Sequence, residues 1–351
     1  MPPEEHILIT GGAGFLGRYI LHAFLTQHPS HRYTVLDISP PSTTPPPAFP
    51  PNHADVAFLE TDVRDAPAVR AALKAARPTV VVHAAGIVPA GAARYSRRRD
   101  LRAKVFGVNV EGTRNVLEAA RACGSVRAFV YTSSATVVGD DLGRTHAETL
   151  VLAANDPSTP FLTTALRPSV LFGPGDANLL PPIHALIAGP PGATSVVLGD
   201  GLNLYDFTYV ANAADAHVLA ALNLLRAETG TSVAGLPVFV TNAAPVPFRD
   251  FCRAVWARFG HVPRREVRVP APAARALARV AGAAAWAAGG REWSLSAGSV
   301  EDAVGVRYVD GRRARDLLGY VPRVGLAEGV RLACEDYKRV LAERDEGENG
   351  G

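Results

Sequence analysis

A short segment near the start of the chain constrains its fold more than any other feature. The apolar run HILIT (6–10) is followed at once by the glycine-rich turn GGAGFLG (11–17), and the residues after it show a helical apolar face. The first glycine of such a turn permits a tight reversal, the second lets the backbone approach a phosphate, and the third lets helix and strand pack closely. Gly11, Gly14 and Gly17 therefore predict a strand, a phosphate-binding turn and a helix whose free N–H groups face the phosphates.

An acidic residue gives this turn its context. Asp37 ends the next apolar run, YTVLD (33–37), and stands 20 residues after Gly17. A carboxylate there can accept hydrogen bonds from the adenosine ribose and repels a 2′-phosphate, so the predicted cofactor is NAD rather than NADP. Phe15 and Leu16, at the start of the helix, are counted with the cofactor-binding residues. The alternative is a structural glycine-rich turn with an unrelated aspartate.

The first half of the chain alternates apolar runs with helical patterns, which is typical of parallel strands joined by crossover helices. The predicted strands are 6–10, 33–37, 56–60, 79–85, 127–134 and 161–168. We therefore predict an α/β protein with a doubly wound parallel sheet (Rossmann) and a smaller C-terminal α+β substrate domain. The predicted domains are an NAD-binding domain at 1–172, to which 206–243 return, a substrate-binding domain at 173–205 and 244–340, and a disordered, charged tail at 341–351.

Composition excludes several classes of protein. A chain of 351 residues with 48% hydrophobic content can bury a large core, and its three scattered cysteines form no bridge or metal pattern, so no metal is expected. The net charge is +3, and the basic run at 93–104 is interpreted as a solvated loop, so nucleic acid is not an expected partner. The N-terminus lacks a secretory signal and no apolar run is long enough to span a bilayer. We expect a protein that is not secreted, in the cytoplasm or on the cytoplasmic face of the endoplasmic reticulum membrane.

The order of several short motifs resembles a known family. TGGAGFLG, TDVRD, HAAG, NVEGT, YTSSA and LRPS follow one another as in the extended short-chain dehydrogenase/reductase family. The later stretches LYDFTYVANAADAHVLAA, VFVTNAAPVPFRDFCRAVW and ARDLLGYVPRVGLAEGV are similar to its 3β-hydroxysteroid dehydrogenase branch, above all to sterol-4α-carboxylate 3-dehydrogenases. The resemblance runs from about His6 to Lys338.

The resemblance implies roles for residues after the glycine-rich turn. Those expected to contact the cofactor or brace its site are Asp62 and Val63 at the adenine, Ala84, Ala85 and Gly86 at the central portion, Asn109 at the strand ends, and Pro168 near the nicotinamide. Ser134 matches the catalytic serine that orients the substrate hydroxyl. Structural roles stay open for three of them: Asp62 as a cap of the helix beginning near Ala66, Asn109 as a partner of a neighbouring strand, and Ser134 as a strand-end cap.

The catalytic Tyr-x-x-x-Lys motif of the family is absent. The helix after the serine matches the family's segment just beyond the lysine, which places Arg144 at the lysine position and Asp140 at the tyrosine position. Tyr131 is expected to point into the core. Either a short segment has been lost from the sequence as written, or the shortened form is native and works slowly, or with another base such as His146. Arg144 is the candidate to hold the cofactor in place of lysine, and the general base is unassigned.

The implied reaction is NAD-dependent oxidation of the 3β-hydroxyl of a sterol or polycyclic terpenoid, with 4α-decarboxylation as an option. One alternative is a catalytically silent NAD-binding protein, and another is a nucleotide-sugar epimerase or dehydratase. The expected partners are a small apolar substrate and, as options, a second copy of the chain and a membrane surface touched by residues 270–290, which are apolar apart from Arg275 and Arg279.

Overall fold

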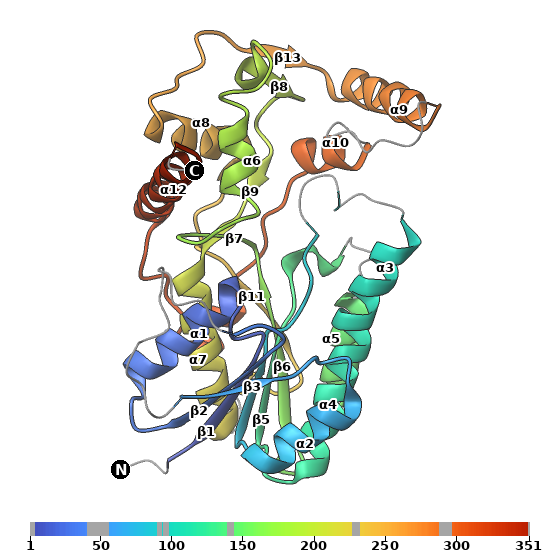
Figure 1. Ribbon diagram of the computed structural model, residues 1–351, viewed down its shortest axis with the longest axis vertical. Coiled ribbons are helices and arrows are strands. Elements are labelled where there is room, and N and C mark those ends of the chain that lie inside the picture. The colour runs from blue at the N-terminus through green and yellow to red at the C-terminus, as the bar shows by residue number, and fades with distance from the viewer. Residues whose placement is uncertain are drawn as a thin grey trace.

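The computed structural model describes residues 4–40, 56–89, 93, 98–138, 144–226, 232–287 and 297–349. Seven parallel strands of these residues form one sheet (Figure 1). From edge to edge they are β11 (Pro237–Val240), β6 (Leu162–Pro168), β5 (Ala128–Thr132), β4 (Val80–His83), β1 (His6–Thr10), β2 (Arg32–Asp37) and β3 (Val56–Glu60). Six are the predicted runs, so the predicted doubly wound α/β fold is confirmed.

Helices cover both faces of this sheet, which explains why its strands are apolar on both sides. In β4, for example, Val80, Val81 and Val82 are at most 1% exposed. The helices α1 (Phe15–Gln27) and α7 (Val210–Arg226) pack on one face, where they share a core with β1. On the other face lie α2 (Ala66–Ala76), α4 (Thr113–Cys123) and α5 (Arg144–Ala153), which Figure 1 shows as a separate layer.

The chain changes direction across the sheet at β1. Its neighbours are β2 on one side and β4 on the other, both parallel to it. In open α/β sheets, ligands bind in the crevice at the carboxyl ends of the strands where the order reverses. The glycine-rich turn after β1 lies at this position.

A smaller group of elements lies beyond the carboxyl ends of the strands (Figure 1). Its strands form pairs: β7 (Val170–Phe172) with β10 (Phe207–Tyr209), β9 (Leu204–Tyr205) with β12 (Val246–Pro247), and β8 (Val196–Leu198) with β13 (Val267–Val269). Its helices are α6 (Leu180–Ala185), α8 (Phe248–Arg258), α9 (Ala271–Ala287), α10 (Ala297–Val304) and α12 (Leu326–Asn349). Its core is aromatic, because Phe207 stacks on Phe251 with ring centroids 3.8 Å apart and the Trp256 indole is buried.

Two predictions about the C-terminal part need correction. Helix α11 (Arg312–Leu318) packs on α7 and β11, so this part of 244–340 belongs to the core of the large sheet. The predicted disordered tail is helical as far as Asn349, because α12 continues through it. Arg339 pairs with Asp336 and Glu343, three and four residues away on one helix face, and such pairs stabilise a helix. The division into domains otherwise stays a prediction.

Candidate functional site

The glycine-rich turn has the geometry of a phosphate cradle. Gly11 has a positive φ of 69°, and a Cβ there would lie 2.6 Å from the Ala85 Cα, so neither the conformation nor the space admits a side chain. Gly14 is the N-cap of α1 and provides no side-chain cap, which leaves the first N–H groups of the helix for a ligand. Leu16 is 8% exposed and packs in the core, so only its backbone can serve a ligand.

Gly17, in the first turn of α1, packs directly against the backbone of the glycine-rich turn. Gly17→Ala should abolish this packing, because the added Cβ would overlap the Gly11 carbonyl oxygen and lie 2.6 Å from the Gly12 Cα. Both neighbours are backbone and cannot move aside. We expect loss of NAD binding in calorimetric titration and a loss of stability of about 1–3 kcal/mol or more in thermal unfolding. Gly325→Ala is the matched control, since a Cβ there meets nothing within 4 Å. Normal NAD affinity in the Gly17 variant would contradict the cradle.

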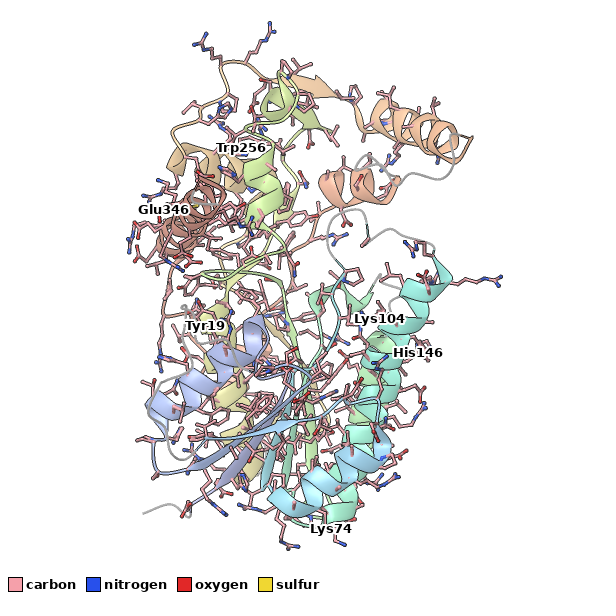
Figure 2. All side chains as sticks on the ribbon, viewed as in Figure 1. Tyr19, Lys74, Lys104, His146, Trp256 and Glu346 are labelled. Carbon is pink, nitrogen blue, oxygen red and sulfur yellow. The ribbon has the colours of Figure 1, made fainter. Side chains whose placement is uncertain are left out.

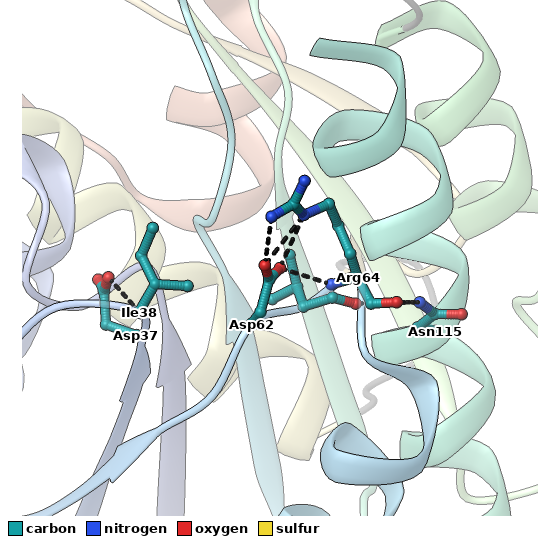
Figure 3. Close-up of polar contacts among 6 residues, drawn as sticks. Asp37, Ile38, Asp62, Arg64 and Asn115 are labelled. Atoms are coloured by element: carbon teal, nitrogen blue, oxygen red, sulfur yellow. Dashed lines mark hydrogen bonds and ion pairs between the residues drawn. The ribbon is translucent and has the colours of Figure 1, made fainter. Parts of the chain in front are cut away.

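Asp37 lies at the carboxyl end of β2 beside this turn. Its Oδ1 accepts the Ile38 N–H at 2.8 Å (Figure 3). Its Oδ2 accepts the Ala13 N–H at 2.9 Å. The carboxylate is thus fixed against the turn, and each oxygen retains capacity for a further bond. Among the described residues no basic side chain pairs with it, so its negative charge stays available to select against a phosphate.

Asp62 follows β3, next to Asp37, whose carbonyl oxygen accepts the Thr61 N–H at 2.8 Å. The Arg64 guanidinium grips the Asp62 carboxylate through two nitrogens, at 2.6 and 3.0 Å (Figure 3). These hydrogen bonds, together with the charge of Arg64, lower the pKa of the Asp62 carboxyl. The cap of α2 is Asp65, so the alternative role of Asp62 as that cap is wrong. Val63 is buried at 5% exposure, and sequence reasoning missed Arg64.

The segment after β4 closes the other side of the turn. The N–H groups of Ala84 and Ala85 reach the backbone oxygen and hydroxyl of Thr10 at 3.1 and 3.3 Å. Asn109 clamps Ile87, whose N–H it accepts at 2.7 Å and to whose carbonyl it donates at 3.0 Å. The structure therefore brings residues 84–86 together with Gly11. Asn109 forms its hydrogen bonds with Ile87, in the segment that follows β4.

Asn109 reaches this segment from an irregular helix. Helix α3 (Arg99–Phe106) runs into a π-helical segment (Gly107–Gly112) before α4 begins. Such wide turns recur at functional sites because they redirect side chains. The sequence carried no readable signal for it.

His83, at the end of β4, links the end of β1 to the start of α4. Its ring nitrogens meet the Thr10 hydroxyl at 2.6 Å and the Thr113 hydroxyl at 2.9 Å. The Thr113 hydroxyl donates to the Asn109 carbonyl, so it accepts from Nε2 of the histidine. Complete burial lowers the pKa of His83 to about 3, which keeps the ring neutral.

The serine end of the site follows β5. Ser134 Oγ contacts the Thr136 hydroxyl at 2.9 Å and accepts the Thr136 N–H at 3.2 Å, so it caps the local turn in this structure. Tyr131 is 3% exposed and stacks on His83, as expected of a core residue. His146 is exposed on α5 (Figure 2), and Asp140 lies outside the described residues.

Arg144 is the first residue of α5, and Pro168 ends β6. Both therefore stand beside the serine turn at the same edge of the sheet. Sequence reasoning missed Glu148, a buried carboxylate behind these residues that binds Ser133 and Arg167. Within the described part of the chain, no group of three or more His, Cys, Asp or Glu could hold a metal ion.

Two family models match the chain. The NAD dependent epimerase/dehydratase family matches residues 7–164, and the 3-beta hydroxysteroid dehydrogenase/isomerase family matches residues 141–271. Among solved structures, a UDP-glucose-4-epimerase of Stenotrophomonas maltophila with bound NAD superposes with a TM-score of 0.69 at 20% identity, covering 97% of this chain and 100% of the other. A dTDP-glucose 4,6-dehydratase of Bacillus anthracis gives 0.68 at 15% identity, with 95% and 97% covered. At such identities these structures support the fold alone.

Several sequence relatives are more similar to this chain than these structures are. Sterol-4-alpha-carboxylate 3-dehydrogenase, decarboxylating, of Saccharomyces cerevisiae is 34% identical, with 99% of this chain and 100% of the relative covered. The Schizosaccharomyces pombe enzyme of the same name is also 34% identical, with 96% and 99% covered, and the human enzyme is 31% identical over 69% of this chain and 64% of the relative. The resemblance inferred from the motifs is thereby confirmed, and the chain belongs to the 3β-hydroxysteroid dehydrogenase family, in its sterol-4α-carboxylate 3-dehydrogenase branch.

Proposed function

We propose that this protein is an NAD-dependent oxidoreductase that oxidises the 3β-hydroxyl of a sterol or related polycyclic terpenoid, coupled to loss of a 4α-carboxyl group. The observation that carries the proposal is the cradle of Gly11, Gly14 and Gly17 beside the fixed carboxylate of Asp37, in a chain related over its full length to sterol-4-alpha-carboxylate 3-dehydrogenases. The two matching family models also include epimerases and isomerases in their descriptions. The experiment therefore has to test the identity of the substrate.

The cofactor would be held by residues of this chain that fit it. The free N–H groups at the start of α1 suit the diphosphate, Asp37 suits the ribose, and Asp62 with Val63 suits the adenine. When bound, NAD supplies the hydride acceptor for the oxidation. Ser134 would give up its bond to Thr136 to orient the substrate hydroxyl, and Arg144 would supply positive charge at the lysine position.

Oxidation removes a hydride from C3 and a proton from its hydroxyl oxygen. The resulting 3-oxo-4α-carboxylate is a β-keto acid, which loses carbon dioxide and leaves its electron pair as an enolate. The proton needs a base, and α5 carries neither tyrosine nor lysine in RTHAETLVLA (144–153). Loss of a general base lowers reaction rates by about 10²- to 10⁴-fold. We therefore propose that this chain, without the tyrosine and lysine, is a slow enzyme.

The direct test is incubation with NAD and a 4α-carboxy-3β-hydroxysterol. The proposal requires reduced nicotinamide and carbon dioxide in equal amounts, at a low rate. Tight NAD binding without either product would favour the catalytically silent alternative, for which the missing tyrosine and lysine are the specific observation. A melting-temperature shift with a uridine diphosphate sugar, and none with the sterol, would favour an epimerase. Sequencing the transcript across Val138–Thr145 would reveal any lost segment.

Asp37→Ser should narrow the preference for NAD over NADP. Serine keeps an acceptor for the neighbouring N–H groups but removes the negative charge, and like-charge contact costs several kcal/mol. We expect the ratio of the two dissociation constants, measured by calorimetry, to fall by about tenfold or more, since each 1.4 kcal/mol is a factor of ten. Asp65→Ser is the control, because serine can still cap α2. An unchanged ratio would assign the selectivity to another residue.

We further propose peripheral membrane contact through 270–290. Leu277 and Val280, on α9, are 58% and 68% exposed, beside the exposed Arg279. Apolar residues flanked by arginines are typical of helices that lie on a membrane surface. Of the helices described, none is long and apolar enough to cross a bilayer. A place in the cytoplasm or on the cytoplasmic face of the endoplasmic reticulum, and a homodimer, also belong to the proposal.

A further inference from the structure

One buried carboxylate lies where three segments of the site meet. Glu148, on α5, is 4% exposed, and its Oε2 accepts the Ser133 hydroxyl at 2.6 Å and the Arg167 Nε–H at 2.9 Å. Its Oε1 accepts a second bond from Nη2 of the same guanidinium. Ser133 directly precedes Ser134, and Arg167 directly precedes Pro168. The carboxylate thus joins the turn after β5 to the last residues of β6.

The third segment is the start of α5 itself. Arg144 and Glu148 are four residues apart on this helix, and such residues lie on one face, one turn apart. Binding of Glu148 to β5 and β6 therefore sets the rotation of the turn that carries Arg144. Ser134, Arg144 and Pro168 are each one residue or one helical turn away from this cluster.

The cluster is built to be rigid. The Arg167 side chain is 17% exposed, and its guanidinium also lies over the Phe239 ring, 5.1 Å from the centroid. A buried guanidinium requires a counter-charge, and here one carboxylate provides it through two parallel bonds. The same carboxylate also accepts the Ser133 hydroxyl. A change in the length of the Glu148 side chain therefore affects the turn after β5, the end of β6 and the start of α5 at once.

We propose that Glu148 is a positioning residue, which holds the Ser134 turn, the start of α5 and the end of β6 in the relative arrangement that the oxidation requires. It acts through Ser133 and Arg167, without contact with the substrate. This inference rests on the proposed function, because Ser134, Arg144 and Pro168 have site roles only within it.

Glu148→Asp is the informative variant. Aspartate keeps the charge that Arg167 needs, but its side chain is one methylene shorter and cannot reach both partners. Glu5→Asp is the matched control, since Glu5 is also buried and binds Arg127 through both oxygens at 2.6 and 2.7 Å. That pair stands at the opposite end of the sheet, where β1 and β5 begin.

Two measurements on the NAD-saturated protein test the inference. Amide hydrogen exchange in the Glu148 variant should be at least about tenfold faster at Ser133, Thr136 and the second turn of α5, with little change elsewhere. Turnover of the sterol should fall about 10- to 100-fold, because misplacement of a reacting group by about 1 Å has an effect of this size. The Glu5 variant should keep its turnover and show no selective rise in exchange at these three places.

A purely structural role predicts a different result. Exchange would then rise throughout the sheet in both variants, and kcat would follow only the folded fraction; this outcome, or unchanged exchange at the three places, overturns the proposal. If the parent protein oxidises no sterol, the proposed function fails, and the local exchange pattern still decides whether Glu148 holds these segments.

Discussion

Replacement of Asp140 by tyrosine and of Arg144 by lysine should raise the rate of NAD-dependent sterol oxidation by about 10²- to 10⁴-fold. The two positions are four residues apart and match the tyrosine and lysine of the family motif, and Arg144 begins α5 at the edge where β5 ends. A lysine ammonium near a phenol favours its ionised form, so the phenol can take the hydroxyl proton near neutral pH. The carboxylate of aspartate has an unperturbed pKa of about 3.9 and is a much weaker base.

The measurement is the steady-state formation of reduced nicotinamide with saturating sterol and NAD. Asp140→Phe combined with Arg144→Lys is the control, because it supplies the ring and the lysine without the hydroxyl, and it should show no gain. NAD affinity should be equal in the parent and both double variants. A tyrosine variant that binds both ligands and stays as slow as its phenylalanine control would mean that the missing segment contributes more than these two side chains.

The second large effect concerns stability in acid. His83 and His217 are completely buried, and burial lowers their pKa values to about 3 and about 4 from the ordinary 6.5. Each ring is neutral in the folded protein and gains a proton in the unfolded chain below pH 6.5. Their contribution to the free energy of unfolding is therefore fully present above pH 6.5. It declines as the pH falls, by up to about 1.4 kcal/mol per pH unit for each histidine. By pH 4 the two together should cost roughly 6 kcal/mol, which is comparable with the whole stability of a typical domain.

Urea unfolding at a series of pH values checks this. Burial raises the pKa values of Asp176 and Asp206, so these groups act in the opposite direction and reduce the observed slope. The double variant His83→Gln with His217→Gln isolates the histidines, because glutamine offers one donor and one acceptor but does not titrate. It should be less stable at neutral pH and lose markedly less stability between pH 6.5 and pH 4. Parallel curves for parent and variant would show that these rings do not control the acid transition.

The local patterns of the sequence were sufficient for much of the fold and for the geometry of the glycine-rich turn, while the roles of the site residues stay predictions. Strands covered on both faces are continuous apolar runs, and the glycine spacing with Asp37 is encoded within about 30 residues, so short-range reasoning reached them. The grip of Arg64 on Asp62 and the clamp of Asn109 on Ile87 depend on side-chain geometry that spacing does not reveal. Glu148 was missed because its partners, Ser133 and Arg167, are brought to it only by the folded sheet.

The helical tail was missed for a related reason. A charged, glycine-containing segment is typical of disorder, but that pattern ignores pairs such as Arg339 with Glu343, which form only once a helix exists. Likewise, the packing of α11 on the large sheet joins segments of the chain that are far apart in sequence.

The placement of α11 has a consequence for synthesis on the ribosome. The core beside β1 is completed by Ala314, Leu318 and Tyr320, which leave the exit tunnel after all the strands of the sheet. Until they arrive, the apolar surface of α7 that they cover stays open to water, and a stalled nascent chain would present a target for chaperones. The half of the chain that begins with the glycine-rich turn is therefore made first, but its core is complete only after residues 314–320 have emerged.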